Sequence, residues 1–298
     1  MRRGVTVVLV GLLVYVAVAG LFVVAMAGAM RGGEGGGGAL FGPRVAVVEI
    51  DGIILDTADV VRELRAHREN PLVRAVVVRI NSPGGVVGPT QEVHDALLRL
   101  REAGKPVVAS LGSVAASGGY YIAVAADEIY ANAGTLTGSI GVVMQLPNFE
   151  QLLKKVGVDY VVVKAGRYKD LGNVARDMTP EERRVLQALL DDVHAQFIGA
   201  VAAGRKLPPE EVTAFADGRV FSGAQARQLR MVDALGGLED AITAAARRAG
   251  LPLPPAVIMP RRRFSITDLL RNELGLGATG LGLGQALPPF KTPLYLMD

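Results

Sequence analysis

The sequence of 298 residues contains no cysteine, no tryptophan and only three histidines. The absence of cysteine excludes disulfide bonds and thiol catalysis, because both require a thiol. The histidines, His67, His94 and His194, are isolated, and none stands at metal-ligand spacing from another. We therefore expect each of them to be a residue on a surface helix, and we expect neither a metal nor another cofactor.

The chain also lacks a large excess of charge of either sign. The 32 basic residues outnumber the 29 acidic ones by only three, and the two signs are interspersed along the chain. No basic stripe with interleaved aromatic residues is present, so the sequence gives no reason to expect a nucleic-acid partner. Half of the residues are hydrophobic, which excludes a disordered chain.

The longest stretch without charge is the 27 residues between Arg3 and Arg31. At about 1.5 Å per residue it reaches roughly 40 Å as a helix, enough to cross a hydrocarbon core of about 30 Å. A cleaved signal peptide is the alternative, since Arg2 and Arg3 precede the stretch and 27–29 (AGA) resembles a cleavage site. The apolar part of such peptides usually spans only about 7 to 15 residues. We predict that residues 1–30 form one transmembrane helix.

Positive charge precedes this stretch, whereas Arg31 and Glu34 cancel after it. The positive-inside rule then places the amino terminus in the cytoplasm and the remainder outside it. The predicted location is the cell membrane, with a single crossing and an extracytoplasmic catalytic domain.

Glycine divides the rest of the chain. Six glycines between 32 and 38 predict a flexible tether over 31–43, and five between 274 and 284 predict a weakly ordered tail. Between them we expect a folded domain over 44–250, followed by a C-terminal extension over 251–298.

Within the folded domain, short β-branched runs alternate with segments of helical spacing. This alternation predicts an α/β fold built from repeated βαβ units with mostly parallel strands. The expected strands are 45–50, 74–80, 106–111, 128–131 and 160–164, and the expected helices are 57–68, 89–103, 117–126, 149–156, 179–203, 223–229 and 238–248.

Two loops after strands are rich in small residues and are candidates for chemistry. In 81–85 (NSPGG), Gly84 and Gly85 leave their N–H groups unobstructed, as an oxyanion hole requires, although an ordinary tight turn explains them as well. In 112–121 (GSVAASGGYY), Ser117 stands where a helix begins, and a serine there is more often an N-cap than a nucleophile.

A serine nucleophile needs a base. Neither His94 nor His194 lies near a loop of this kind, so a lysine is the other option. Lys169 follows the predicted strand 160–164 in a loop with glycine, although an ordinary surface role explains it equally well. A lysine base requires an apolar site and hydrogen bonds to its neutral amine, and Ser139 is a candidate partner.

Five motifs, taken together, resemble the SppA-type signal peptide peptidases of peptidase family S49. They follow one another in the order that the family shows and cover most of residues 44–248. They are INSPGG (80–85), GSVAASGGYYIA (112–123), GTLTGSIGV (134–142), AGRYKD (165–170) and GRVFSGAQARQLRMVDALGG (218–237).

The resemblance implies a ClpP/crotonase-like fold and a Ser-Lys dyad. It makes Ser117 the nucleophile and Lys169 the general base. The N–H of Gly118 and one from Gly84 or Gly85 would form the oxyanion hole, and Ser139 would orient the lysine. It also implies homo-oligomeric rings in which the serine of one protomer meets the lysine of the next, and substrates that are signal-peptide remnants in the membrane. The length fits the form with one catalytic domain.

Three other functions compete with this interpretation. A crotonase-like acyl-CoA enzyme would also use paired N–H groups, but it would not need Ser117 together with Lys169. A non-catalytic membrane scaffold of the same fold could have lost either residue. A Ser-His-Asp protease lacks its histidine, because none occurs between His94 and His194.

Overall fold

The computed structural model describes residues 18, 20, 42–260 and 294–296. The predicted transmembrane helix, apart from residues 18 and 20, the tether, apart from residues 42 and 43, and the glycine-rich tail lie outside these residues. Within the described part of the chain, no helix is long and apolar enough to span a membrane. Residues from Pro43 onward form one compact unit.

The unit is built on a sheet in the strand order β7-β6-β4-β2-β1-β9, with β5 paired to β4 and β8 paired to β5. All of these pairs are parallel except β6–β7, which is antiparallel. The predicted α/β fold with mostly parallel strands is confirmed. The strands are β1 (Arg44–Asp51), β2 (Val73–Ser82), β4 (Val107–Ala116), β5 (Glu128–Ala131), β6 (Leu136–Gly138), β7 (Val220–Ser222), β8 (Ala234–Leu235) and β9 (Ala256–Ile258).

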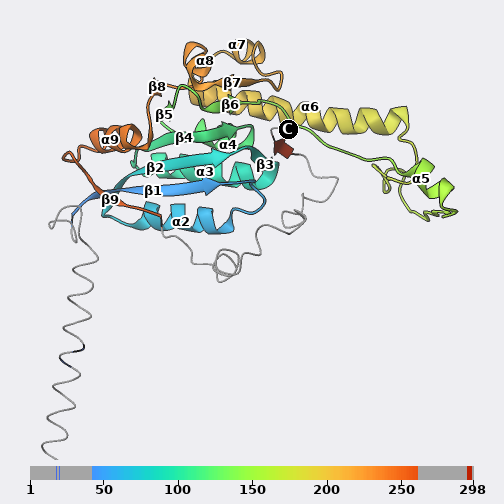
Figure 1. Ribbon diagram of the computed structural model, residues 1–298, viewed down its shortest axis with the longest axis horizontal. Coiled ribbons are helices and arrows are strands. Elements are labelled where there is room, and N and C mark those ends of the chain that lie inside the picture. The colour runs from blue at the N-terminus through green and yellow to red at the C-terminus, as the bar shows by residue number, and fades with distance from the viewer. Residues whose placement is uncertain (1–17, 19, 21–41, 261–293, 297–298) are drawn as a thin grey trace, which may run out of the picture. The chain divides into compact units, whose positions relative to one another are not determined.

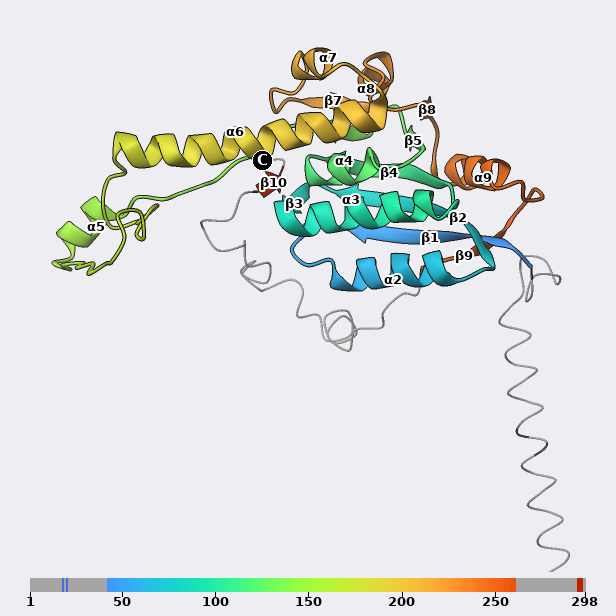
Figure 2. The same ribbon diagram turned by 180° about the vertical axis from the view of Figure 1, so that it is seen from behind.

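The central strands are buried on both faces, which explains their continuous β-branched sequences. Along β1, Val45 and Val47 face one hydrophobic cluster, whereas Val48 and Ile50 face the other. Helices α2 (Ala58–Glu69), α3 (Val87–Glu102) and α4 (Gly118–Ala123) cover one face (Figure 2), and α9 (Leu238–Arg248) packs on the opposite face. The core therefore consists of two layers separated by the sheet.

Several predicted boundaries were wrong. The first half of the loop expected over 112–121 is a continuation of β4, because Ala115 and Ala116 pair with Thr137 and Gly138 of β6. The helix expected over 117–126 is only α4. Sequence periodicity missed the shortest elements, namely β6, β7, β8, β9, α7 (Pro209–Thr213), β3 (Gly84–Val86) and β10 (Leu294–Leu296), which pairs antiparallel with β3.

The strand predicted at 160–164 is absent: this segment belongs to no helix or strand and pairs with no strand of the described chain. Its valines are exposed, Val161 by 82% and Val163 by 96%. The β-branched residues favour a strand, but a strand also needs a neighbour to receive its hydrogen bonds.

This segment belongs to a projection that we term the arm, residues 145–190. It contains α5 (Glu150–Lys155), a series of turns and the first part of α6 (Pro180–Arg205), and it extends beyond the sheet (Figure 1). Within the arm only Gly172 and Glu182 are buried. The second part of α6 packs into the core through residues such as Phe197. The arm is therefore held at one end.

The histidines lie on helices, as predicted, but His67 and His94 are not surface side chains, since they are only 13% and 12% exposed. The His94 ring packs 4.9 Å from that of Tyr121, which in turn lies 5.0 Å from that of Phe197. These contacts join α3, α4 and α6. Helices that cover a sheet bury one face, and His94 lies at the edge of that face.

Burial gives His94 an expected effect on acid stability. It lowers the pKa of His94 below its ordinary value of 6.5, against the opposing effect of Asp95. The unfolded chain then binds this proton more readily, so the stabilisation is complete above pH 6.5 and is lost as the pH falls below it. We expect His94→Gln to lose less of its pH 7 stability at pH 5 than the unmodified chain does, as measured by urea unfolding. Equal losses in the two proteins would contradict this role.

Candidate active site

Ser117 lies at the junction between β4 and α4, in a backbone conformation that is rare for a residue with a side chain. Its φ is 50° and its ψ is −118°. Such a conformation costs on the order of 1–3 kcal/mol and persists only where the surroundings enforce it. Here the Ser117 N–H donates to Gly138 O at 2.7 Å, and Ser117 O accepts from Tyr121 N at 2.8 Å. A strained serine between a strand and a helix is the geometry of a nucleophile elbow.

The hydroxyl of Ser117 is buried and has no hydrogen-bond partner in the described chain. Although Ser117 occupies the N-cap position of α4, its side chain makes no capping bond. Leaving a buried polar group unpaired costs about 1–3 kcal/mol, and buried polar groups are rarely left so. The ordinary N-cap role therefore does not account for this serine.

The two small-residue loops meet at Ser117. A Cβ on Gly118 would lie 3.2 Å from Gly84 Cα and 3.2 Å from Gly85 N, so the three predicted oxyanion glycines are in contact. A Cβ on Gly85 would lie 2.1 Å from Ile54 O, which leaves no room for a side chain. Glycine is required here by the close approach of two backbones.

The glycine N–H groups differ in their partners. Gly84 N donates to Ser82 Oγ at 3.1 Å. Gly84 O accepts from Ile54 N, and Val86 N donates to Ile54 O, so the backbone groups of Gly85 face the opposite edge of β3. That edge pairs with β10. The N–H of Gly85 therefore faces the side away from Ile54, where β10 lies in this structure, and Gly84 and Gly85 both remain candidates for the second oxyanion donor.

Ser139 follows the glycine that accepts the hydrogen bond of Ser117, so β6 brings it beside the nucleophile candidate. It has a φ of 51° and is 7% exposed, and its N–H donates to Arg219 O at 2.8 Å. It also lines a cavity of about 850 Å³ together with Val142, Met144 and Leu190. Polar and charged residues, among them Asp191, His194 and Arg219, complete the lining, so the cavity beside Ser139 is mixed in character.

Lys169 lies elsewhere. It is an exposed residue of the arm, in a turn where its N–H donates to Gly166 O at 3.2 Å. The described chain gives Ser117 no partner from this turn. One chain therefore assembles Ser117, the three glycines and Ser139, and carries Lys169 on a separate projection.

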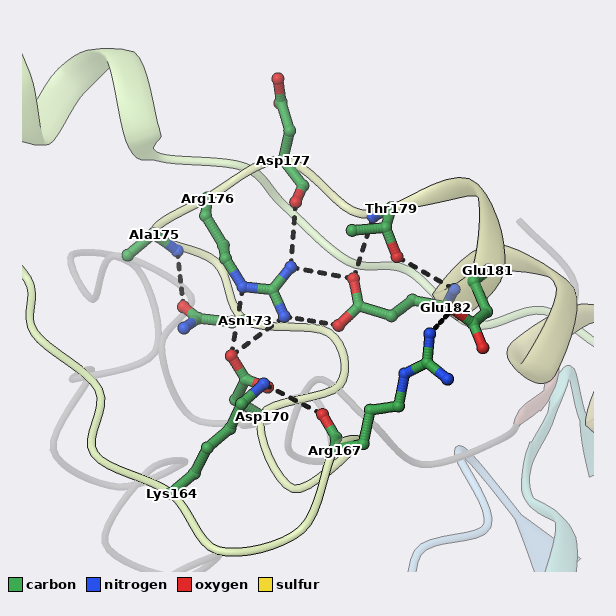
Figure 3. A network of polar contacts seen from close by, with 10 residues as sticks. All are labelled: Lys164, Arg167, Asp170, Asn173, Ala175, Arg176, Asp177, Thr179, Glu181 and Glu182. Atoms are coloured by element: carbon green, nitrogen blue, oxygen red, sulfur yellow. Dashed lines mark hydrogen bonds and ion pairs between the residues drawn. The ribbon is translucent and has the colours of Figure 1, made fainter.

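Sequence reasoning missed the ion pairs around this turn. Arg176 contacts both Asp170 and Glu182 (Figure 3). The one signal in the sequence is Thr179 followed by Glu182, the spacing of a capping box, and the structure forms that box at the start of α6. Nothing in the local sequence marks Arg176 as its partner.

Comparisons with known proteins agree with these motifs. The family model for Peptidase family S49 matches residues 99–252. A putative protease of Synechocystis is 48% identical over 209 residues, which are 70% of this chain and 75% of that protein. Protease 4 of Salmonella typhi is 36% identical over 70% of this chain, but this covers only 35% of its own length.

Two further similarities are more distant. A putative signal peptide peptidase SppA of Enterococcus faecium is 31% identical, over 67% of this chain and 62% of that protein. Among solved structures, a ClpP1 variant from Listeria monocytogenes is 17% identical with a TM-score of 0.45, covering 66% of this chain and 94% of that one.

Proposed function

Since the chain belongs to peptidase family S49, we propose that it is a serine endopeptidase with Ser117 as nucleophile and Lys169 as general base. The observation that carries this proposal is the buried, unpartnered hydroxyl of Ser117, held in a strained conformation against a glycine-lined loop. A group kept in this way, at a cost in stability, is available to react.

The proposed reaction assigns a step to each of these residues. Lys169, as a neutral amine, takes the proton of Ser117 while the hydroxyl oxygen attacks the peptide carbonyl. The carbonyl oxygen becomes negative and is stabilised by the N–H of Gly118 and by one N–H from Gly84 or Gly85. The lysine then protonates the leaving amine, and water hydrolyses the acyl-enzyme by the same route. Ser139, beside Ser117, would accept a hydrogen bond from the lysine amine or donate one to it.

We further propose that the lysine comes from a neighbouring copy of the chain, in a homo-oligomeric ring. Ser117 is buried in the body of the fold, whereas Lys169 is exposed on the arm. The arm also exposes Tyr160, Val161 and Val163, an apolar segment of the kind that protein interfaces cover. Assembly would bury this segment and bring Lys169 to a second subunit's Ser117.

Assembly can be tested on the arm directly. We expect Val163→Asp to shift the protein toward smaller species in light scattering and to lower its activity in parallel, because a charge would be buried at the interface. Leu72→Asp, at a partly exposed leucine outside the arm, is the matched control and should leave the size unchanged. A Val163→Asp protein of unchanged size would contradict the interface.

The proposed substrates are apolar peptides left in the membrane after signal-peptide cleavage. Support comes from the charge-free stretch before Arg31, which would anchor the enzyme in the cell membrane with its catalytic domain outside the cytoplasm, and from the relative named as a putative signal peptide peptidase. An enzyme held at the bilayer meets such peptides where they accumulate.

The nucleophile is tested in the full chain purified in detergent, with a fluorogenic apolar peptide as substrate. Ser117→Ala is expected to reduce hydrolysis by a factor of roughly 10³ or more, as loss of a nucleophile does in other serine proteases. Ser113→Ala removes an exposed hydroxyl from the same strand and should leave the rate unchanged. Hydrolysis that persists in Ser117→Ala would exclude Ser117 as nucleophile.

A further inference from the structure

The turn that carries Lys169 is held by a cluster of charged side chains to which Lys169 itself does not contribute (Figure 3). Lys164 is hydrogen-bonded to Asp170 and to Arg167 O, and Arg167 is paired with Glu181. The other cations of the turn thus have carboxylate partners, while Lys169 is exposed. The cluster fixes the backbone around Lys169 and leaves its amine outside.

Arg176 is the centre of this cluster. On one side its Nε and Nη2 atoms donate to Asp170 Oδ2 at 3.1 and 2.9 Å. On the other side its Nη1 donates to Glu182 Oε2 at 2.8 Å, and its Nη2 contacts the second oxygen. A planar guanidinium with several fixed donors can join two carboxylates in one geometry, which a lysine could not do.

The two carboxylates belong to different structural elements. Asp170 directly follows Lys169 in the chain. Glu182 lies in the first turn of α6, where it accepts from Thr179 N at 2.9 Å and completes the capping box. Arg176 therefore ties the backbone next to Lys169 to the start of a helix. We term Asp170, Arg176 and Glu182 the clamp.

Helix α6 connects the clamp to the core. It runs for 26 residues, and its second part buries Val193, Phe197 and Val201 in the main hydrophobic cluster. A continuous helix of this length is a stiff element compared with the turns of the arm. Through the clamp, the position of the Lys169 turn depends on a rigid helix.

The clamp is charged at neutral pH. Hydrogen bonding to Lys164 and Arg176 lowers the pKa of Asp170 to about 2, and hydrogen bonding to Arg176 and Thr179 lowers that of Glu182 to about 2. The pairing therefore persists over the whole range in which a peptidase of this kind would work.

We propose that Arg176 is a positioning residue for the general base. By holding Asp170 against the first turn of α6, it fixes the direction in which Lys169 leaves the arm and brings the amine toward Ser117 of the next subunit. The inference rests on the proposed Ser-Lys function. It adds Arg176, Asp170 and Glu182 to the residues on which catalysis depends, although none of them touches the substrate.

The test compares full-length Arg176→Gln with the unmodified protein over a range of pH. A misplaced base is expected to lower kcat by roughly 10- to 100-fold with little change in KM. The acidic limb of the rate profile should also move to higher pH, because an amine that is less enclosed keeps its proton longer. A variant that is merely partly unfolded would show a lower rate of hydrolysis, but its pH profile would not shift.

Two further variants make the result decisive. Arg176→Lys keeps the positive charge but lacks the several fixed donors of the guanidinium, so it should fold and show an intermediate rate. It replaces Arg176→Gln in the test if that variant does not fold. Asp170→Asn should cause a smaller loss when added to Arg176→Gln than in the unmodified protein, because its contact with Arg176 is then already broken and only its pair with Lys164 is left to lose.

Arg183→Ala is the matched control, since Arg183 is an exposed arginine that lies next to Glu182 in the first turn of α6. An unshifted profile in both Arg176 variants, with Lys169→Ala inactive, would overturn the clamp and leave the dyad in place. If Lys169→Ala retained full activity, the proposed function itself would fail.

Discussion

When chains with Ser117→Ala and chains with Lys169→Ala are combined in one oligomer, hydrolysis should return although each variant alone is inactive. The reason is the separation of the two residues in one chain: Ser117 is buried at the start of α4, and Lys169 is exposed on the arm. A Lys169→Ala subunit still offers Ser117, and a Ser117→Ala neighbour still offers Lys169. In a cyclic oligomer with random equal mixing, each site has roughly a quarter chance of combining the two.

The mixed oligomer is best made by co-expressing the two variants with different affinity tags and purifying by both tags. The expected rate is then a substantial fraction of that of unmodified protein. A control variant tests for general effects of losing a positive charge. Lys155→Ala removes an exposed lysine of α5 and should be fully active without a second variant. Mixed oligomers of normal size without activity would refute a dyad shared between subunits.

Gly85→Ala is expected to abolish hydrolysis, whereas Gly88→Ala, three residues further along, is not. An added Cβ at Gly85 would lie 2.1 Å from Ile54 O, and it can be accommodated only if β3 moves away from residue 54. That movement displaces the N–H proposed for the oxyanion hole. Loss of one such donor costs about 10²- to 10³-fold in kcat, and overpacking costs about 1–3 kcal/mol of stability.

Gly88 is the matched control because nothing lies within 4 Å of a Cβ built on it. It belongs to α3, where alanine is favoured over glycine by about 0.5–1 kcal/mol. Rates at saturating substrate and urea unfolding curves distinguish the two effects. A Gly85→Ala protein with unchanged kcat would show that β3 does not supply the oxyanion hole.

The central sheet was predictable because each of its buried strands is a continuous β-branched run between turn residues. Strands of two or three residues, such as β6, carry no such signal. Yet β6 decides the geometry of the site, since its Gly138 accepts the hydrogen bond that constrains Ser117. The strain at Ser117 results from this tertiary contact, and no local pattern encodes it.

The candidate site residues came from motifs and from a family resemblance, and the structure brings all of them except Lys169 together in one chain. The clamp escaped prediction for a physical reason. Ion pairs between residues of a loop have no periodicity, and Arg176 is six residues from each of its partners. In the sequence it cannot be told from other surface arginines.

The apolar segment of the arm has a consequence for the chain before it assembles. Residues 160–163 (YVVV) form an uncharged, exposed and mostly β-branched stretch, which is the kind of segment that adds to the sheet edges of other molecules. Asp159 and Lys164 flank it with opposite charges and act as gatekeepers against such pairing. If the arm assembles as proposed, newly made chains would divide between ordered assembly and aggregation, and the balance would depend on how quickly each chain finds its neighbour.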